Sequence, residues 1–188
     1  MQKILNFIFL RYLNFKYSKI KFKGKIYIDY QSSIIIYNNE LTFGENVVVR
    51  SRKKGYHAAM PFASTILIDV ADAKVRIGDN SRLNGVYIHA QKEISIGKNC
   101  VIASGVNIID SNGHVLNSLD RTKGRDLPKE IIIEDNVWIG LNCVILKGTR
   151  IGKNSVISAG SIVKGIFPEN SIISGNPAEV VDIIRNTN

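Results

Sequence analysis

The sequence has few of the residues that build disulfide frameworks and metal centres. Only two cysteines and three histidines occur among its 188 residues. Two cysteines cannot form a disulfide scaffold, and nothing in the sequence requires an oxidising compartment. A zinc carbonic anhydrase needs three converging histidines, whereas His57, His89 and His114 include no closely spaced pair. We therefore expect neither a disulfide nor a metal centre.

Long apolar runs are also missing. The run from Ile4 to Leu10 is too short to span a bilayer, and no small-residue cleavage site follows it. A transmembrane helix and a signal peptide are therefore not expected, and we predict a cytoplasmic protein. Disorder is not expected either, because apolar residues make up 45% of the chain and charged residues 22%. This length suits one domain with a continuous core.

The charge is strongly one-sided, with a formal net charge of +9 and a pI near 9.6. Such a balance favours anionic partners, which include nucleic acid, acidic membrane surfaces and phosphate-bearing cofactors. No recognisable nucleic-acid-binding module is present. The phosphate-bearing cofactor is therefore the favoured partner.

A repeat of six residues dominates the stretch from Ile131 to Ile166. Aliphatic residues recur at every sixth position, namely Ile133, Ile139, Ile145, Ile151, Ile157 and Val163. Four residues after the first five lie small or β-branched ones: Val137, Cys143, Thr149, Ser155 and Ser161. Directly before each of these small residues stands an Asn or a Gly, namely Asn136, Asn142, Gly148, Asn154 and Gly160, and both residue types tolerate left-handed backbone. A period of six fits neither a helix nor a flat strand. It predicts an all-β solenoid, a parallel β-helix with about 18 residues in each triangular coil.

The repeat also organises the rest of the chain. Residues 26–166 are expected to form the coil, with loops near 52–65 and 110–130 where the pattern breaks. Both cysteines fall on small inward positions, four residues after Ile96 and Ile139, and are expected to be buried thiols. Residues 167–188 are interpreted as a tail whose segment from Val180 to Arg185 is a short helix folded over the last coil.

Residues 1–25 differ from the coil, since they contain seven Lys or Arg residues and no acid. We interpret them as a short helix that caps the open end of the coil. The alternative is a weak peripheral contact with a membrane.

His114 is the leading candidate for chemistry. It lies in DSNGH at the start of the 110–130 loop, next to a flexible Gly113, and imidazole titrates near neutrality. These features suit a general base that removes a proton from a hydroxyl, although a polar loop histidine is an equal alternative. Trp138 precedes an inward isoleucine and should point outward, either to bind a ligand or to pack against another subunit. His57 and His89 are interpreted as structural.

Four motifs carry a resemblance to a known family. VWIG, VILKGTRIGKNSVISAGSIV and SGNPA, with DSNGH upstream, resemble the hexapeptide-repeat acetyltransferases, within roughly Ile77 to Ile184. The subgroup is that of galactoside, maltose, nodulation-sugar and polysaccharide O-acetyltransferases. The resemblance implies a left-handed β-helix, a homotrimer and acetyl-CoA as the acyl donor.

The resemblance also implies roles for individual residues. His114 would be the base, Asn84 an acceptor-binding residue and Trp138 a wall of the acceptor site. Gly140 and Leu141 would lie beside the donor, with the Leu141 amide steadying the oxyanion, and the Ala159 backbone would bind the pantetheine arm. Related enzymes often carry a Thr-Lys pair and a later Arg, whereas this chain has Lys164, Gly165 and Glu179 there. Lys164 and Arg185 are the cations left to hold the cofactor phosphate.

The sequence therefore predicts an acetyl-CoA-dependent O-acetyltransferase that acts on a sugar hydroxyl of a surface polysaccharide or its precursor. The alternatives are N-acetylation of an amino sugar, O-acetylation of serine, and a non-enzymatic β-helix scaffold. No residue identifies the sugar, so the acceptor class depends on the resemblance.

Overall fold

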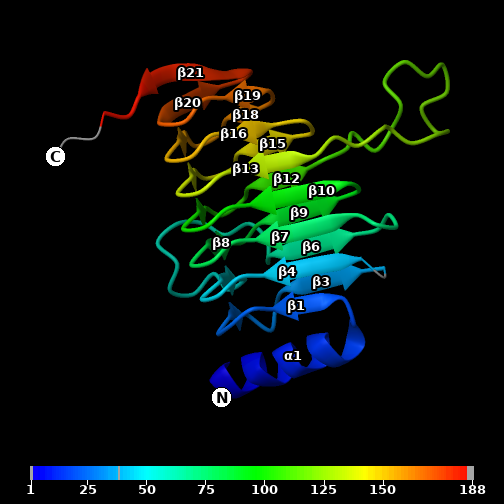
Figure 1. Ribbon diagram of the computed structural model, residues 1–188, viewed down its shortest axis with the longest axis vertical. Helices are drawn as coiled ribbons and strands as arrows, with labels where there is room; N and C mark the ends of the chain where they lie inside the picture. Colours follow the sequence, from blue (N-terminus) through cyan, green and yellow to red (C-terminus); the bar gives the residue numbers. More distant parts are fainter. Residues whose placement is uncertain (1, 38, 186–188) are drawn as a thin grey trace.

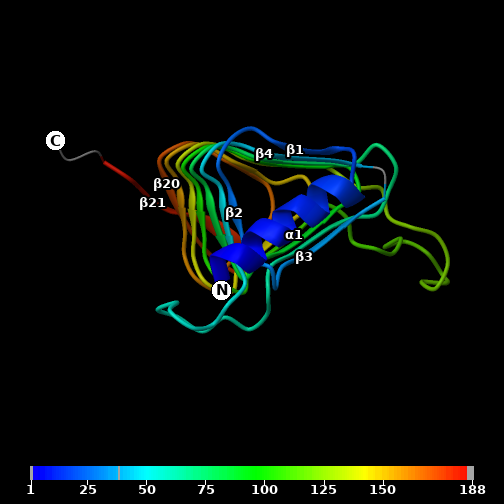
Figure 2. The same cartoon turned by 90° about the horizontal axis from the view of Figure 1, so that it is seen from below.

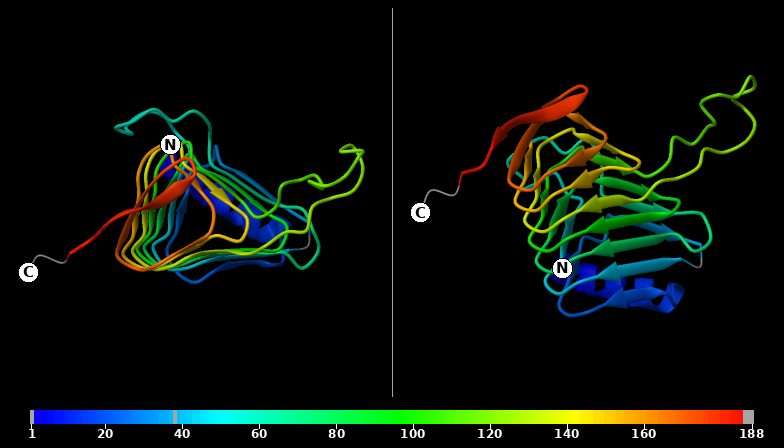
Figure 3. Two further views of the ribbon diagram at one scale, coloured as in Figure 1. Left: turned by 90° about the horizontal axis from the view of Figure 1, so that it is seen from above. Right: turned by 45° about the horizontal axis from the view of Figure 1, so that its top comes forward.

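The protein is a three-sided coil of short parallel strands with one helix at its base. The computed structural model describes residues 2–37 and 39–185. Figure 1 shows the coils stacked along the long axis, with α1 (Gln2–Lys16) below them and β21 (Ala178–Ile183) above. Seen along this axis, the coil is triangular (Figure 3).

Three sheets, named here A, B and C, form the three sides, and their strands pair in parallel except β20 with β21. Sheet A contains β1 (Ile20–Phe22), β4 (Glu40–Phe43), β7 (Lys74–Ile77), β10 (Glu93–Ile96), β13 (Ile131–Ile133), β16 (Arg150–Ile151) and β19 (Ile166–Phe167). Sheet B contains β2 (Tyr27–Ile28), β5 (Val48–Arg50), β8 (Arg82–Asn84), β11 (Val101–Ile102), β14 (Trp138–Ile139), β17 (Val156–Ile157), β20 (Ser171–Gly175) and β21. Sheet C contains β3 (Ser33–Ile36), β6 (Thr65–Ile68), β9 (Tyr87–Ala90), β12 (Asn107–Ile109), β15 (Val144–Leu146) and β18 (Ile162–Val163).

The six-residue repeat produces this coil directly. Each strand pairs with the third strand after it, so Ile133 is in register with Ile151, and Ile139 with Ile157. The repeated aliphatics all point into the core and are at most 1% exposed. Because three repeats make one turn, each side chain stacks on its counterpart one coil away, at the ~4.8 Å spacing of paired strands. The prediction of a three-sided parallel coil is confirmed.

The chain turns the corners of the triangle with left-handed residues. Asn136, Asn142 and Asn154 have φ values of 56°, 57° and 60°, and Gly148 and Gly160 both have 77°. At the corner between sheets A and B, asparagine side chains also bond from coil to coil, as in Asn136 Nδ2 to Asn154 Oδ1 at 3.1 Å. Asparagine therefore supplies both the tight turn and a hydrogen bond along the coil axis.

The lower end of the core is covered by α1. α1 lies across the open base of the triangle (Figure 2), where Leu13 is 1% exposed against the first coil. The coil begins at Ile20, earlier than the expected residue 26, because β1 already pairs with β4. Among the described residues no helix is long and apolar enough to cross a membrane.

The expected C-terminal helix is wrong. The segment Ala178–Ile183 is a strand, β21, and it folds back antiparallel on β20. The last coil leaves one edge of sheet B without a partner, and an unpaired edge is costly to leave open. Val180, Val181 and Ile183 favour strand, so this segment pairs with the exposed edge instead of forming a helix.

Two loops leave the coil on either side of sheet C (Figure 3). Residues 51–64, the anchored loop, connect β5 to β6 at the B–C corner. Residues 110–130, the projecting loop, connect β12 to β13 at the C–A corner and extend away from the coil (Figure 1). Sheet C therefore has one large loop at each of its long edges.

Candidate functional site

The B–C corner presents two free backbone donors. Leu141 and Ala159 lie in turns of successive coils, and Leu141 O accepts a bond from Gly160 N at 2.8 Å. Neither the Leu141 nor the Ala159 N–H has an acceptor among the residues that the structure describes. Ala159 is exposed and Leu141 half-buried. These N–H groups can therefore donate to a ligand that lies along the corner.

Gly140 has a packing role at the same corner. A Cβ atom there would lie 2.7 Å from Ala159 N and 2.9 Å from Ile157 O. Both contacts are to backbone, which cannot move aside without distorting the next coil. Gly140 therefore keeps the turns of these two coils close together.

Asn84 lies lower on the B–C corner, at the end of β8. Its side chain is 4% exposed and donates from Nδ2 to Ile102 O at 3.0 Å. The next residue, Gly85, packs against Met60 and Phe62 of the anchored loop. Asn84 is thus held in place by the coil and the loop, and its Oδ1 atom has no donor among the described residues.

Trp138 points outward from sheet B, as its position in the repeat predicts, and is 55% exposed. It is in register with Val101 below and Val156 above. These residues form an apolar column on the outer face of sheet B.

His114 lies on the projecting loop at the opposite edge of sheet C. Its side chain is exposed and has no hydrogen-bond partner among the described residues. The start and end of the loop are joined by a bond from Lys129 N to Asp110 O at 2.9 Å. Desolvation raises the pKa of the Asp110 carboxyl, which accepts bonds from Gln91 N and Lys92 N at 2.8 and 2.7 Å.

An ion pair restrains the projecting loop close to His114. Lys147 Nζ bonds Asp126, and their side chains are 13% and 11% exposed. Asp126 also accepts a bond from Asn112 N at 3.0 Å. The Lys147 hydrogen bond, followed by that from Asn112, lowers the pKa of Asp126. This clamp therefore fixes the chain two residues before His114.

His89, which the sequence led us to interpret as structural, has a carboxylate partner that the sequence does not reveal. His89 Nε2 lies 3.0 Å from Asp69 Oδ1 on the outer face of sheet C. Asp69 follows β6 and His89 lies in β9, so only the register of neighbouring coils brings them together. His89 O also accepts a bond from Asp110 N at 3.3 Å, which places the pair beside the base of the projecting loop. A carboxylate that orients an imidazole is a known arrangement for a base.

The two cations expected at the cofactor phosphate lie at different corners. Lys164 follows β18 at the C–A corner, and it is exposed. Arg185 follows β21, next to Ile184, whose N–H bonds Asn170 O at 2.6 Å at the A–B corner. Within one chain the structure therefore separates Lys164 from Arg185, and both from Ala159.

The predicted site residues fall into two main groups at the edges of sheet C. Asn84, Gly140, Leu141 and Ala159 belong to the B–C corner, and His114 and Lys164 to the C–A corner. A side of six residues spans roughly 20 Å, so the two groups do not meet within one chain.

Among the described residues no cluster of three or more His, Cys, Asp or Glu could hold a metal. Cys100 and Cys143 are free and buried, and burial raises the pKa of both thiols.

Comparison with known proteins agrees with this architecture. Residues 130–164 match the family model described as the hexapeptide repeat of succinyl-transferase. A galactoside O-acetyltransferase of Escherichia coli is 37% identical over 110 residues, which cover 58% of this chain and 54% of that protein. The chain spans about half the length of the curated relatives it matches.

Two solved structures resemble the coil. A hexapeptide-repeat acetyltransferase of Vibrio cholerae, complexed with acetyl-CoA, has a TM-score of 0.61 at 27% identity and covers 76% of this chain and 70% of its own. The polySia-specific acetyltransferase NeuO has a TM-score of 0.63 at 27% identity, and the match covers 90% of this chain and 86% of NeuO. By its repeat, its three-sided coil and these likenesses, the chain resembles the hexapeptide-repeat acyltransferases, including galactoside O-acetyltransferases.

Proposed function

We propose that the protein is an acetyl-CoA-dependent O-acetyltransferase that acts on a sugar hydroxyl. We also propose that its coil is left-handed. The observation that carries this proposal is the order of the groups along the coil axis. Asn84 belongs to the β7–β9 coil, His114 follows the β10–β12 coil, and Leu141 belongs to the β13–β15 coil. At ~4.8 Å per coil, the loop that carries His114 leaves the coil at a level between Asn84 below and the free Leu141 N–H above, although at the other corner of sheet C.

This order suits transfer of an acetyl group. The acceptor oxygen attacks the thioester carbonyl, its proton passes to His114, and the new C–O bond replaces the C–S bond. The imidazole then returns the proton to the departing thiolate. The Leu141 N–H would stabilise the charge that develops on the carbonyl oxygen, and one such donor contributes ~3 kcal/mol. The Ala159 N–H, one coil higher, would bind the amide-bearing arm of the donor.

The site requires a second copy of the chain, and we propose a homotrimer. The outer face of sheet A carries ion pairs such as Lys21–Glu40 and Arg150–Glu134. Sheet C instead presents Leu67, Ile109 and Leu146 on its outer face, in one column of register that His89 interrupts. Turning the face of sheet C toward a threefold axis would bring the C–A corner of one subunit to the B–C corner of the next and leave the face of sheet B open.

The exposed leucines of the projecting loop support the same assembly. Leu116, Leu119 and Leu127 are 61%, 108% and 81% exposed, although each is large and apolar. A loop that is clamped at its base but leaves its apolar side chains in solvent fits a surface outside its own chain. We propose that the neighbouring B–C corner provides this surface.

The base of the coil offers a contact with a membrane. α1 buries Leu13 but exposes Ile4, Phe7, Ile8 and Phe15 by between 56% and 92%. Lys3 and Arg11 lie on the same helix, which has no acid in its first turn. An apolar stripe with cations favours the interface of an anionic bilayer. We therefore propose that α1 caps the coil and also gives weak peripheral membrane binding.

The test is an acceptor screen with acetyl-CoA. Nucleotide sugars and oligosaccharides are offered to the full chain, free thiol is measured, and products are analysed by mass spectrometry before and after mild base. We expect acceptor-dependent thiol release and a product ester that mild base removes. A product that resists base would identify amide formation on an amino sugar instead. Failure of the protein to bind acetyl-CoA in calorimetry would contradict the proposal.

A further inference from the structure

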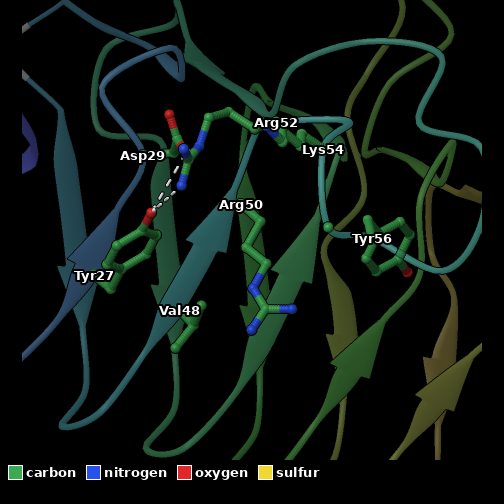
Figure 4. Close-up of a pocket in the computed structure, with 8 residues that line it drawn as sticks. Tyr27, Asp29, Val48, Arg50, Arg52, Lys54 and Tyr56 are labelled. Carbon is green, nitrogen blue, oxygen red and sulfur yellow. Dashed lines mark hydrogen bonds and ion pairs between the residues drawn. The ribbon is translucent and has the colours of Figure 1, made fainter. Parts of the chain in front are cut away.

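A cavity of about 460 Å³ lies on the outer face of sheet B, where its lining residue Arg50 is in register with Asn84. β2 and β5 form its floor and the anchored loop forms one wall (Figure 4). Its polar lining is dominated by cations, namely Arg50, Arg52 and Lys54. Asp29 is the one carboxylate among the residues that line it.

Asp29 is already neutralised by Arg52. Its side chain is 2% exposed, and Arg52 Nε donates to Oδ2 at 2.7 Å while Gln31 N donates to Oδ1 at 3.1 Å. Arg52 Nη2 also bonds the Tyr27 hydroxyl at 3.3 Å. Figure 4 shows Arg52 beside Asp29 and Tyr27 at one side of the cavity. The Arg52–Asp29 ion pair therefore fixes that wall, and its two charges cancel in the net charge of the cavity lining.

Two cations remain without a carboxylate. Arg50, the last residue of β5, and Lys54, in the anchored loop, are exposed and form no ion pair among the described residues. A cavity with two free cations attracts an anion, and the planar guanidinium can hold a carboxylate or phosphate with two parallel bonds.

Two tyrosines flank the arginine. In Figure 4, Arg50 lies between Tyr27 on one side and Tyr56 on the other. Tyr56 packs against His57 with ring centroids 4.8 Å apart, and Gly55, with a φ of 84°, turns the loop beside it. A tyrosine offers an apolar face and a hydroxyl together, which matches a sugar ring with its C–H faces and hydroxyl rim.

The cavity opens on the same face as Trp138. Tyr27 is in register with Val48, Val48 with Arg82, and the column continues through Val101 to Trp138. Three strand spacings separate Val48 from Trp138, about 14 Å. Arg82, exposed between them, adds a third cation to this path. A chain of a few sugars can therefore reach from the cavity to the tryptophan.

We infer that this cavity binds an anionic sugar unit of the acceptor, so that the acceptor is a charged oligosaccharide or polysaccharide. That the bound saccharide is the acetyl acceptor rests on the proposed function, but the binding of the saccharide does not depend on acetyl transfer. Carboxylate and phosphate present the same chemistry to Arg50 and Lys54, and the experiment separates them.

The experiment is calorimetric titration of the full chain with three oligosaccharides. Hexagalacturonate carries carboxylates, pentamannose phosphate carries a phosphate, and maltohexaose is neutral. We expect at least one charged ligand to bind and the neutral one not to bind. Because a hydrogen bond to a charged group is worth about 1.5–3 kcal/mol, Arg50→Ala and Lys54→Ala should each weaken binding about tenfold or more.

The matched control removes the same two kinds of charge from α1, as Lys3→Ala with Arg11→Ala. Equal loss of affinity in this control, unchanged affinity in the Arg50 and Lys54 variants, or absence of binding by both charged ligands would overturn the inference. Acetyl-CoA affinity is measured on the same samples. If acetyl-CoA does not bind the wild-type chain, the proposed function fails while the saccharide result stands on its own; if it binds normally, a negative saccharide result concerns this cavity alone.

Discussion

The two large loops beside sheet C differ in where their apolar side chains lie. The anchored loop folds back on the coil, with Met60 only 3% exposed and Ser104 Oγ bonded to Ala59 O. The projecting loop is held by its base and by the Lys147–Asp126 ion pair, while Leu119 is fully exposed. The anchored loop packs against its own chain, whereas the projecting loop leaves apolar side chains in solvent, where we propose that a neighbouring subunit covers them. This difference distinguishes a loop that stabilises the fold of its own chain from the loop for which we propose a site between chains.

Changing the histidine of the projecting loop should have the largest effect. An acceptor hydroxyl is a weak nucleophile at neutral pH, and a general base contributes ~10²–10⁴-fold. His114→Ala should therefore lower kcat by that factor and leave acetyl-CoA affinity almost unchanged. Steady-state kinetics measure the loss of kcat, and calorimetry measures the affinity for acetyl-CoA.

His89→Ala is the control for this prediction, because His89 has the oriented carboxylate partner that His114 lacks in one chain. Its turnover should stay close to wild type, as should that of His57→Ala. If the loss of turnover occurs in His89→Ala and not in His114→Ala, then the His89–Asp69 pair is the base.

Stability should respond to the anchored loop and not to the projecting one. Met60→Ala removes a buried side chain and should lower the free energy of unfolding by about 2–5 kcal/mol. Leu119→Ala removes a side chain that is fully exposed in one chain and should leave the unfolding of dissociated subunits unchanged. Urea denaturation at low protein concentration measures both. Equal losses would mean that the projecting loop also packs on its own coil.

The sequence predicted the coil well because the repeat acts through local geometry. Every inward aliphatic from Ile133 to Val163 is buried, and the left-handed corner residues could be identified as Asn or Gly. The C-terminal helix was wrong because the unpaired edge of β20, which a linear sequence does not display, recruits Ala178–Ile183 as a strand.

The candidate site was predicted only in part. The place of His114 in its loop made it a candidate, and the family resemblance implied roles for Leu141 and Ala159, but neither showed that they lie on opposite sides of sheet C. The His89–Asp69 pair depends on coil register, and the Arg50 cavity on how the anchored loop closes over β5. Each of these results from contacts between segments that are distant in sequence.

The clamp of the projecting loop should affect turnover more than folding. Asp126→Asn removes the ion pair with Lys147 and frees the segment before His114, and a misplaced base can cost up to about 100-fold in kcat. The Lys147 bond holds the pKa of Asp126 below its ordinary value of 3.8. The stabilisation by the clamp is therefore complete above that value and lost as the pH falls below it.

The stabilisation by the Lys147–Asp126 ion pair is measured by comparing the acid unfolding of wild type and Asp126→Asn. The difference in stability between them should shrink as the pH falls through the folded-state pKa of Asp126. A difference that stays constant from neutral to acid pH would show that the carboxylate does not carry the clamp.

The smallest effect is expected at α1, whose exposed stripe is a second apolar surface without a partner in the chain. Ile4→Ser with Phe15→Ser should reduce sedimentation with anionic vesicles and leave thermal unfolding nearly unchanged. Leu13→Ser is the contrast, because Leu13 is buried and its loss should lower the melting temperature. Vesicle binding that is the same in wild type and the double variant would leave α1 as a cap alone.

The central claim, a site shared between chains, is tested most directly by mixing two inactive variants. His114→Ala removes the base, and Leu141→Pro removes the free N–H while keeping a turn that precedes a left-handed Asn142. Subunits of the two variants are unfolded together, refolded and assayed. If His114 and Leu141 come from different chains, random trimers should regain about a quarter of wild-type activity, the share of interfaces with both groups intact. Activity that stays at the level of the separate variants, in mixtures shown to form hybrid trimers, would contradict the shared site.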